Sequence, residues 1–191
     1  MPLNNIEQYR FIFIAGLHRS GTTILGDLLK QHPAITGLEN TGVSMNEGQL
    51  VQSVYPAAFR YGGPGKFGFA PEMHLTEKSA LFSNENRLKL FREWGQYLDL
   101  QQLIIVEKSP PNLIKTRFLQ ALFPSSLFVI IKRHPIAVTF ATKNRWKNSS
   151  VIDLFAHWVK CHEIFQADKP YLTQVVEFKY SEFVQDPDTH L

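Results

Sequence analysis

One stretch of the chain, residues 10–33, constrains the fold more than any other. It begins with five apolar residues, 11–15, that are hydrophobic on both faces, as in a buried strand of a parallel sheet. A turn over residues 16–21 follows, with a glycine at each end, and beyond it apolar residues recur at helical spacing. A helix that starts after such a turn directs free N–H groups and the positive end of its dipole at the turn. The stretch therefore predicts a strand–turn–helix unit that binds an anion.

The turn nearly matches the phosphate loop of nucleotide-hydrolysing enzymes, G-x-x-x-x-G-K-[ST]. Gly16 and Gly21 have the required spacing, and Thr23 stands at the last position. Thr22 replaces the lysine that would reach a β- or γ-phosphate, whereas Arg19 places a cation inside the turn. We therefore expect a loop that holds an oxyanion but lacks the full arrangement for a nucleoside triphosphate with Mg²⁺.

The residues of the turn also resemble a known family. With a strand before it and a helix ending in histidine–proline after it, the turn is similar to the 5′-phosphosulfate loop of sulfotransferases that use PAPS (3′-phosphoadenosine 5′-phosphosulfate). The closest likeness is to the arginine-containing branch with the tyrosylprotein and many bacterial sulfotransferases. The resemblance implies PAPS as co-substrate, no metal, and a loop formed by His18, Arg19, Ser20, Gly21, Thr22 and Thr23.

A second motif follows an apolar run at residues 126–131, which we interpret as another buried strand. In sulfotransferases, a strand ending in Arg-x-Pro and a serine eight residues after that arginine bind the 3′-phosphate of PAPS. Arg133 matches the arginine, but Ala141 stands at the position of the serine and departs from the family pattern. Thr139 or Thr142 is then the candidate hydroxyl, and Thr142 is the nearer neighbour.

Three further residues are candidates for catalysis. Lys108 follows an apolar run at 103–106, on the sheet edge expected for the loop, and many sulfotransferases carry a lysine there near the sulfuryl group. Glu39 falls where tyrosylprotein sulfotransferases have a catalytic glutamate, although Asn40 can occupy the aligned position instead. Glu47 is the second candidate for the general base. The resemblance implies that Arg19 and Lys108 stabilise negative charge in the transition state.

The order of apolar runs and helical patterns predicts an α/β fold. We expect a P-loop-containing three-layer sandwich, with a mostly parallel sheet of four or five strands and helices on both faces. The resemblance implies a single sulfotransferase-like domain over residues 1–191 that lacks the usual C-terminal helices of the family. A long segment at 56–75, rich in glycine, proline and aromatic residues, is interpreted as a substrate-side flap.

Charge and composition limit the partners. A net charge of +3 favours an anionic ligand but is too small to indicate nucleic acid. The chain lacks an apolar run near the roughly 20 residues of a membrane span, and its first residues do not resemble a signal peptide. We therefore expect a cytoplasmic protein without a membrane partner. His157 and Cys161 are four residues apart and could share a metal, but two candidate ligands are insufficient evidence for a metal site.

The resulting hypothesis is an enzyme that moves the sulfuryl group of PAPS to a hydroxyl or amine acceptor by in-line displacement. The sequence does not distinguish a small-molecule, carbohydrate or peptide acceptor, and it leaves the oligomeric state open. Two alternatives remain. One is a phosphotransferase of the nucleotide-kinase kind, against which the missing loop lysine counts. The other is a non-catalytic module that binds PAPS or adenosine 3′,5′-bisphosphate (PAP).

Overall fold

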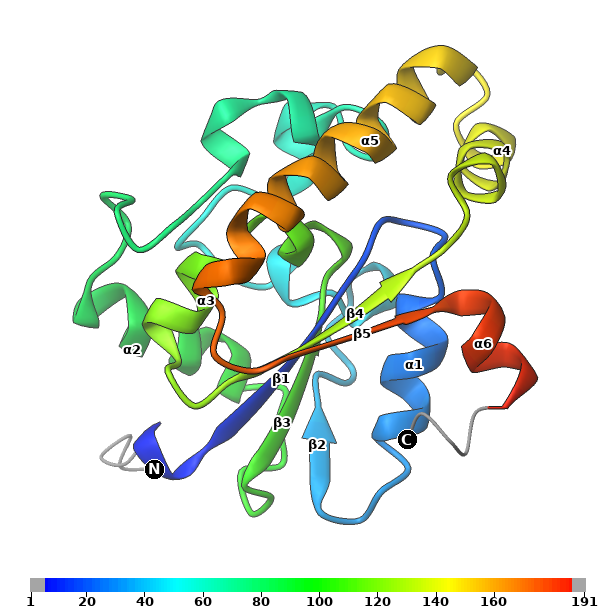
Figure 1. Cartoon of the computed structure of the whole chain (residues 1–191). Coiled ribbons are helices and arrows are strands. Elements are labelled where there is room, and N and C mark those ends of the chain that lie inside the picture. The colour runs from blue at the N-terminus through cyan, green and yellow to red at the C-terminus, as the bar shows by residue number, and fades with distance from the viewer. Residues whose placement is uncertain (1–5, 187–191) are drawn as a thin grey trace.

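The computed structural model of the chain describes residues 6–186, and a five-stranded sheet forms its centre (Figure 1). The five strands pair in parallel, with β1 in the middle. In spatial order they are β2 (Ile35–Gly37), β3 (Ile104–Lys108), β1 (Arg10–Ala15), β4 (Leu127–Lys132) and β5 (Val175–Lys179). The expected α/β class and parallel sheet are confirmed.

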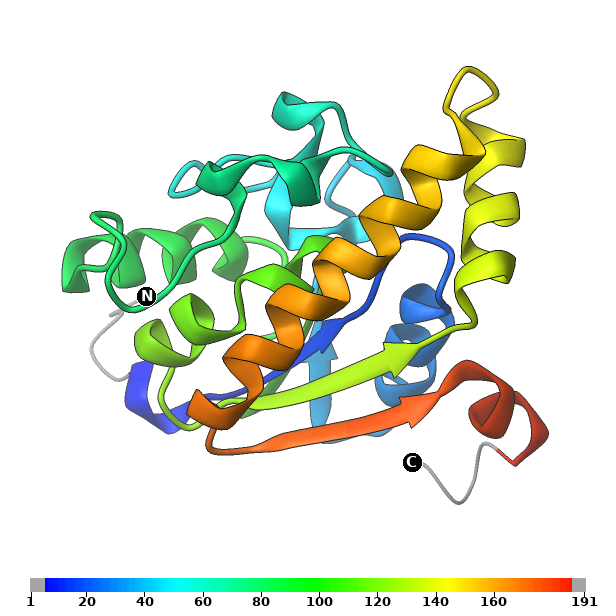
Figure 2. The same ribbon diagram turned by 45° about the horizontal axis from the view of Figure 1, so that its top comes forward.

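Helices cover both faces of this sheet and complete three layers (Figures 1 and 2). One face carries the two helices α1 (Thr22–Leu29) and α6 (Tyr180–Gln185). The opposite face carries α2 (Asn84–Gly95), α3 (Thr116–Leu122) and α5 (Val151–Asp168), and α4 (Pro135–Arg145) packs against α5. No helix within residues 6–186 is long and apolar enough to cross a membrane.

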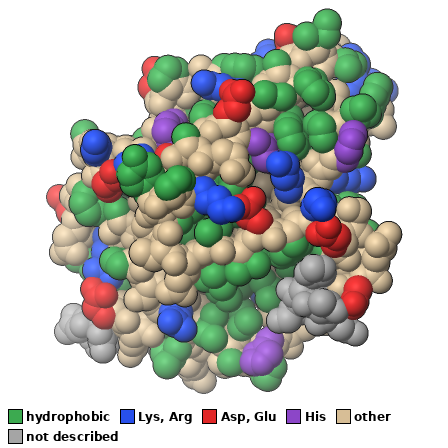
Figure 3. All heavy atoms as spheres, viewed as in Figure 1, with side chains coloured by type: hydrophobic (Ala, Val, Ile, Leu, Met, Phe, Trp, Pro, Cys, Tyr) green, Lys and Arg blue, Asp and Glu red, His purple; other side chains and the backbone are tan. Residues whose placement is uncertain are grey.

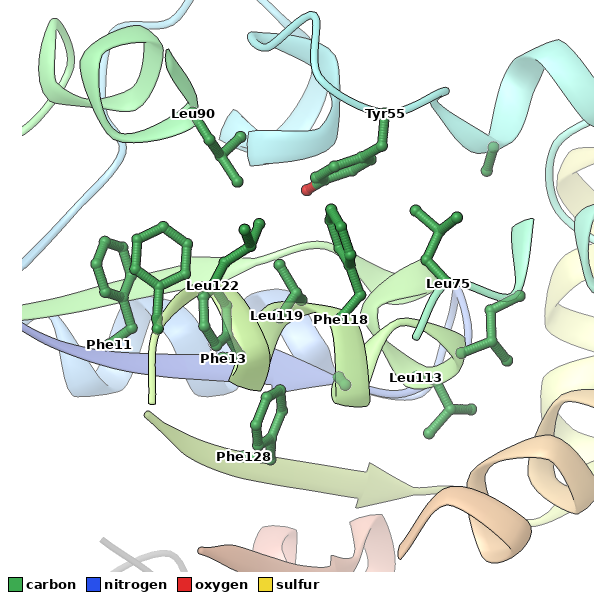
Figure 4. Packing of buried hydrophobic residues seen from close by; sticks show 14 of the residues in the cluster. Phe11, Phe13, Tyr55, Leu75, Leu90, Leu113, Phe118, Leu119, Leu122 and Phe128 are labelled. Atoms are coloured by element: carbon green, nitrogen blue, oxygen red, sulfur yellow. The ribbon is translucent and has the colours of Figure 1, made fainter. Parts of the chain in front are cut away.

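The residues of β1 show why both faces of the sheet are covered. Phe11 and Phe13 point into the larger core, where their rings stack with centroids 5.3 Å apart. Figure 4 shows them beside Phe128 of β4, with Leu90 of α2 on the far side of the core. The neighbouring residue Ile14 points the other way, into the core beneath α1. A strand with apolar residues on both faces is stable only between two such layers.

The structure differs from the sequence prediction at three elements. The spacing of apolar residues over 77–98 predicts a helix along that whole range. The helix begins only at Asn84, because the Ser83 side chain accepts a hydrogen bond from the Asn86 N–H (3.1 Å) and caps it there. The segment after α1 forms the short strand β2, which was not expected. The helical spacing of Ile24 with the apolar residues after it predicts that Ile24 belongs to the buried stripe of α1, but it is half-exposed, whereas Leu25 is buried.

The cap on α2 gives a modest prediction for stability. Replacing Ser83 by alanine removes the acceptor for a helical N–H, so the free energy of unfolding should fall by about 1 kcal/mol. Urea denaturation followed by circular dichroism measures this difference. Ser125→Ala, at an exposed serine outside the helices, is the control and should leave the midpoint unchanged. Equal midpoints for both variants would contradict the capping role.

The expected flap forms a packed wall next to the turn at residues 16–21. It contains short 3₁₀ turns at Ala58–Tyr61, Phe67–Phe69 and Pro71–Met73. The side chain of Phe67 is fully buried, and the N–H of Gly68 donates a hydrogen bond to His157 Nε2 (3.1 Å). The segment therefore connects the region of the turn to α5.

Candidate active site

The turn at residues 16–21 joins β1 to α1 and has a strained backbone. Arg19 (φ 70°) and Gly21 (φ 101°) both adopt left-handed conformations, and the Ser20 N–H donates to the Leu17 carbonyl (3.0 Å). A Cβ atom at Gly21 would lie 2.6 Å from the ring of Tyr180, so only glycine permits this approach. The turn thus leaves the N-terminus of α1 open to an anion, with the exposed Arg19 beside it.

A second cation meets this turn from the end of β4. Nη1 of Arg133 donates a hydrogen bond to the carbonyl oxygen of Arg19 (2.8 Å). The guanidinium of Arg133 also lies over the ring of Tyr180, 4.5 Å from its centroid. The structure therefore brings Arg19 and Arg133 together at one sheet edge, with the ring of Tyr180 against both Gly21 and the guanidinium of Arg133.

A cavity of about 510 Å³ opens beside Arg133, between α4, α5 and α6. Lys132 and Lys179 add two more positive charges to its lining, and Trp158 and Val184 provide apolar surface. Figure 3 shows Lys and Arg side chains near the carboxyl ends of β4 and β5, beside apolar surface. A cavity with cations at its rim and an apolar lining suits a ligand that combines an aromatic group with a phosphate.

A buried ion pair lies at the end of β3. Lys108 pairs in register with Ile14, two residues before the turn begins, and its Nζ donates to the Met45 carbonyl (3.0 Å). Oε1 of Glu47 is 3.7 Å from the same Nζ, and Oε2 of Glu47 accepts from Gln49 Nε2 (2.5 Å). Burial raises the pKa of Glu47 and lowers the pKa of Lys108, and the attraction between them opposes both shifts. A carboxylate and an ammonium are thus held together, out of water, beside the turn.

The structure does not bring Glu39 to the turn. Its carboxylate pairs with Nζ of Lys30 (3.3 Å), and Lys30 caps the C-terminal end of α1, opposite to the end that meets the turn. The Glu39 side chain is 60% exposed and lines a cavity of about 640 Å³ beside the edge strand β2. That cavity is the larger of the two, but it contains none of the turn residues. Asn40, the other aligned candidate, is exposed.

The two threonines proposed for the second phosphate also lie elsewhere. Thr139 and Thr142 are three residues apart and share the buried face of α4, where they line a small cavity with His18. Ala137 lies about 200° around the helix from Thr139 and lines the cavity beside Arg133 instead. Neither hydroxyl therefore lines the cavity beside Arg133, because the helical period directs both side chains toward the small cavity with His18.

His18 is an internal anchor of the turn. Its ring lies between Phe67 and Trp146, with centroid distances of 5.9 and 6.4 Å, and neither ring nitrogen has a hydrogen-bond partner within residues 6–186. Burial, together with the nearby His157 and Lys108, lowers the pKa of His18 to about 3, so the ring is neutral at pH 7. The side chains of Ser20 and Thr22 are also buried, whereas Thr23 is half-exposed. The groups of the turn that can face an anion are therefore mainly backbone N–H groups.

Two residues at the site were not found from the sequence. Glu107 is fully buried beside Lys108, and a carboxylate directly after the apolar run of a buried strand is the signal that would have identified it. Tyr180 follows β5 directly and packs against both Gly21 and Arg133. In the described part of the chain, no group of three or more His, Cys, Asp or Glu side chains is placed to hold a metal ion.

These groups together can hold two anionic centres and move one proton. The helix N-terminus with Arg19 suits one anion, and Arg133 with its cavity suits a second. The buried pair of Lys108 and Glu47 supplies a cation to stabilise developing charge and a carboxylate to accept a proton.

Comparisons with known proteins agree with this arrangement. A sequence model described as "Sulfotransferase family" matches residues 12–191. The nodulation protein NoeE of Sinorhizobium fredii is 25% identical over 137 residues. This match covers 70% of the chain and 31% of NoeE, so the chain spans about a third of the length of that relative.

Two solved structures share the fold. Sulfotransferase STF1 from Mycobacterium tuberculosis H37Rv has a TM-score of 0.58 at 18% identity, covering 95% of this chain and 65% of its own. The sulfotransferase domain of the Synechococcus PCC 7002 olefin synthase has a TM-score of 0.57 at 16% identity. The match covers 94% of this chain and 69% of the chain of that structure. At these identities the likeness extends to the fold alone.

Proposed function

The chain belongs to the sulfotransferase family, and from this premise we propose that it transfers the sulfuryl group of PAPS to a hydroxyl or amine acceptor. One observation carries the proposal. The hydrogen bond from Arg133 to the Arg19 carbonyl (2.8 Å) fixes two cationic sites on one sheet edge. A nucleotide with a phosphosulfate at one end and a 3′-phosphate at the other requires two such sites.

The donor would bind across the carboxyl edge of the sheet. Backbone N–H groups of residues 19–23 and the guanidinium of Arg19 would hold the phosphosulfate. Arg133 would hold the 3′-phosphate at the mouth of the 510 Å³ cavity, where Lys132 and Lys179 add positive charge. Ala141 lacks a hydroxyl and the two threonines do not line this cavity. The polar side chains that line it and could assist Arg133 are Lys132, His134, Lys179, Tyr180 and Ser181.

The transfer itself would use the ion pair at the end of β3. The acceptor oxygen or nitrogen forms a bond to sulfur while the bond from sulfur to the bridging oxygen of PAPS breaks, and PAP leaves with the electron pair. Lys108 and Arg19 stabilise the negative charge that develops on the bridging oxygen and the sulfuryl group. Glu47 takes the proton of the acceptor. We assign this role to Glu47 rather than Glu39 because Glu47 lies 3.7 Å from Lys108, whereas Glu39 pairs with Lys30.

Ligand-dependent thermal stability tests the donor. PAP at a hundred times its dissociation constant should stabilise the protein by about 2.7 kcal/mol, which corresponds to a rise in melting temperature of roughly 5–10 °C. Adenosine 5′-phosphate, which lacks the 3′-phosphate, is the matched control and should have a smaller effect at the same concentration. ATP with Mg²⁺ should also have a smaller effect.

Two outcomes would contradict the proposal. A larger shift with ATP and Mg²⁺ than with PAP would favour a phosphotransferase. Tight PAP binding without release of PAP from PAPS, for any of a set of hydroxyl and amine acceptors, would favour a binding module.

A further inference from the structure

Three consecutive residues at the end of β3 hold the segment at residues 45–49 from both faces of the sheet. Lys108 points toward α1 and contacts the Met45 carbonyl and the Glu47 carboxylate, as described above. The side chains of Glu107 and Ser109 point to the opposite face. Glu107 accepts a hydrogen bond from the N–H of residue 48, and Ser109 accepts one from the N–H of residue 49. The segment that carries the proposed base is thus attached to the sheet on both sides.

Glu107 makes the central contacts of this attachment. It is fully buried, and its Oε1 accepts hydrogen bonds from the Gly48 N–H (3.0 Å) and the Ser109 hydroxyl (2.6 Å). Its Oε2 accepts from Asn112 Nδ2 (2.5 Å). Of these three donors, the Gly48 N–H belongs to the segment, whereas Ser109 and Asn112 follow β3 and hold the carboxylate in place. The carboxylate therefore joins the segment to the end of β3.

Gly48 fits this carboxylate closely. A Cβ atom at residue 48 would lie 2.5 Å from Oε1 of Glu107 and 2.8 Å from its Cγ, so any larger residue would push the segment away from β3. The Gly48 carbonyl is also fixed, because it accepts a hydrogen bond from Trp94 Nε1 (3.0 Å). The backbone of residue 48 is therefore held at both its N–H and its carbonyl.

A continuous path of hydrogen bonds leads from Glu107 to the proposed base. The Ser109 hydroxyl donates to Glu107 and accepts from the Gln49 N–H (3.0 Å). The side chain of Gln49 then donates from Nε2 to Oε2 of Glu47 (2.5 Å), and its Oε1 accepts from the Ala58 N–H (3.0 Å). The orientation of the Glu47 carboxylate is thus set by groups that are themselves fixed by Glu107 and Ser109.

We propose that Glu107 is a positioning residue, which holds Gly48 and Gln49 so that the Glu47 carboxylate stays beside Lys108. The chemical role of that carboxylate rests on the proposed function, whereas the attachment of the segment does not. Loss of the attachment should lower the rate of transfer without changing donor affinity, because neither Gly48 nor Gln49 belongs to the turn or to the cavity beside Arg133.

Glu107→Gln tests this directly. The neutral amide keeps the shape of the side chain but weakens the hydrogen bonds to Gly48 and Ser109. We expect kcat for release of PAP from PAPS to fall about fivefold, with the KM for PAPS and the dissociation constant of PAP unchanged within about twofold. Amide hydrogen exchange at Gly48 and Gln49 should become faster. Ser109→Ala removes the acceptor for the Gln49 N–H and one of the three donors to Glu107, but it leaves the bond between Glu107 and Gly48. It should have a smaller effect in the same direction and is used if Glu107→Gln does not fold.

Two controls separate positioning from a general loss of packing. Gly95→Ala adds a methyl group at the end of α2, where the nearest atom is 3.8 Å away. Gly48→Ala adds the same group only 2.5 Å from Oε1 of Glu107. Ser126→Ala removes a buried hydroxyl that has no hydrogen-bond partner among the described residues. Both controls should leave kcat and the exchange of Gly48 and Gln49 unchanged, whereas Gly48→Ala should reproduce the effects of Glu107→Gln.

The outcomes distinguish this inference from the proposed function. If the wild-type protein transfers sulfuryl groups and Glu107→Gln leaves both kcat and the two exchange rates unchanged, the inference is wrong. If the wild-type protein shows no transfer, hydrogen exchange alone decides. Faster exchange at Gly48 and Gln49 then supports the attachment while the proposed function fails, and unchanged exchange overturns both.

Discussion

Replacing Glu47 by glutamine should lower the turnover of PAPS by roughly a hundredfold or more, the usual contribution of a general base. The affinity for PAP should stay within about twofold, because Glu47 lies outside the turn and outside the cavity beside Arg133. Glutamine preserves the shape of the side chain and its amide oxygen can still accept a hydrogen bond from Gln49 Nε2, but it cannot take the proton of the acceptor. Release of PAP from PAPS, measured with a set of hydroxyl and amine acceptors, gives the turnover.

The environment of Glu47 also predicts the pH dependence of turnover. Burial raises the pKa of this carboxyl above its ordinary value, and the attraction of Lys108 only partly opposes the shift. A base must be deprotonated to act, so kcat should fall as the pH is lowered through this raised pKa. The fall should therefore begin at a higher pH than for an exposed glutamate, and it should be absent from the residual activity of Glu47→Gln.

Glu39→Gln is the matched control, because the sequence makes both glutamates candidates for the same role. Its carboxylate is largely exposed and pairs with Lys30, and exposed ion pairs contribute little to stability. We expect turnover and PAP affinity of this variant to stay within about twofold of the wild type. If Glu39→Gln loses turnover and Glu47→Gln retains it, the assignment of the base made here is reversed.

The sheet and the turn could be predicted because their signals are local. Apolar runs on both faces mark the buried parallel strands, and the spacing of Gly16 and Gly21 marks the turn before α1. The meeting of Arg19 with Arg133 follows from topology, since Arg19 lies in the turn after β1, Arg133 follows β4, and the carboxyl ends of these neighbouring strands share one edge. Such an inference needs no knowledge of the side-chain conformations.

The position of the glutamates could not be predicted in this way. The segment that leads from β2 to Glu47 contains three left-handed residues other than glycine, Asn40 (φ 54°), Met45 (φ 55°) and Asn46 (φ 49°). Such conformations are uncommon for residues other than glycine, although asparagine adopts them more readily than methionine, and they are held by the surrounding structure. The Met45 carbonyl, for example, accepts from Lys108, about sixty residues away. Spacing in the sequence therefore says little about which carboxylate reaches the turn.

The second large effect is expected at Arg133. Replacing it by alanine should weaken PAP binding by between about tenfold and a hundredfold, because a hydrogen bond to a charged group contributes about 1.5–3 kcal/mol. Titration calorimetry of PAP measures the loss. Arg133→Lys keeps the charge but not the planar pair of donors, so its loss should be intermediate. Arg145→Ala, at an exposed arginine further along α4, is the control and should leave the affinity unchanged.

Measuring the affinity for adenosine 5′-phosphate as well as for PAP distinguishes between two roles of Arg133. Its guanidinium faces the cavity, and it also supports the turn by donating to the Arg19 carbonyl (2.8 Å). If contact with the 3′-phosphate dominates, Arg133→Ala should weaken PAP binding while the affinity for adenosine 5′-phosphate, which lacks that group, stays the same. If support of the turn dominates, both affinities should fall by the same factor. Unchanged affinity for both nucleotides would mean that the donor does not bridge Arg19 and Arg133, and the proposed mode of PAPS binding would be wrong.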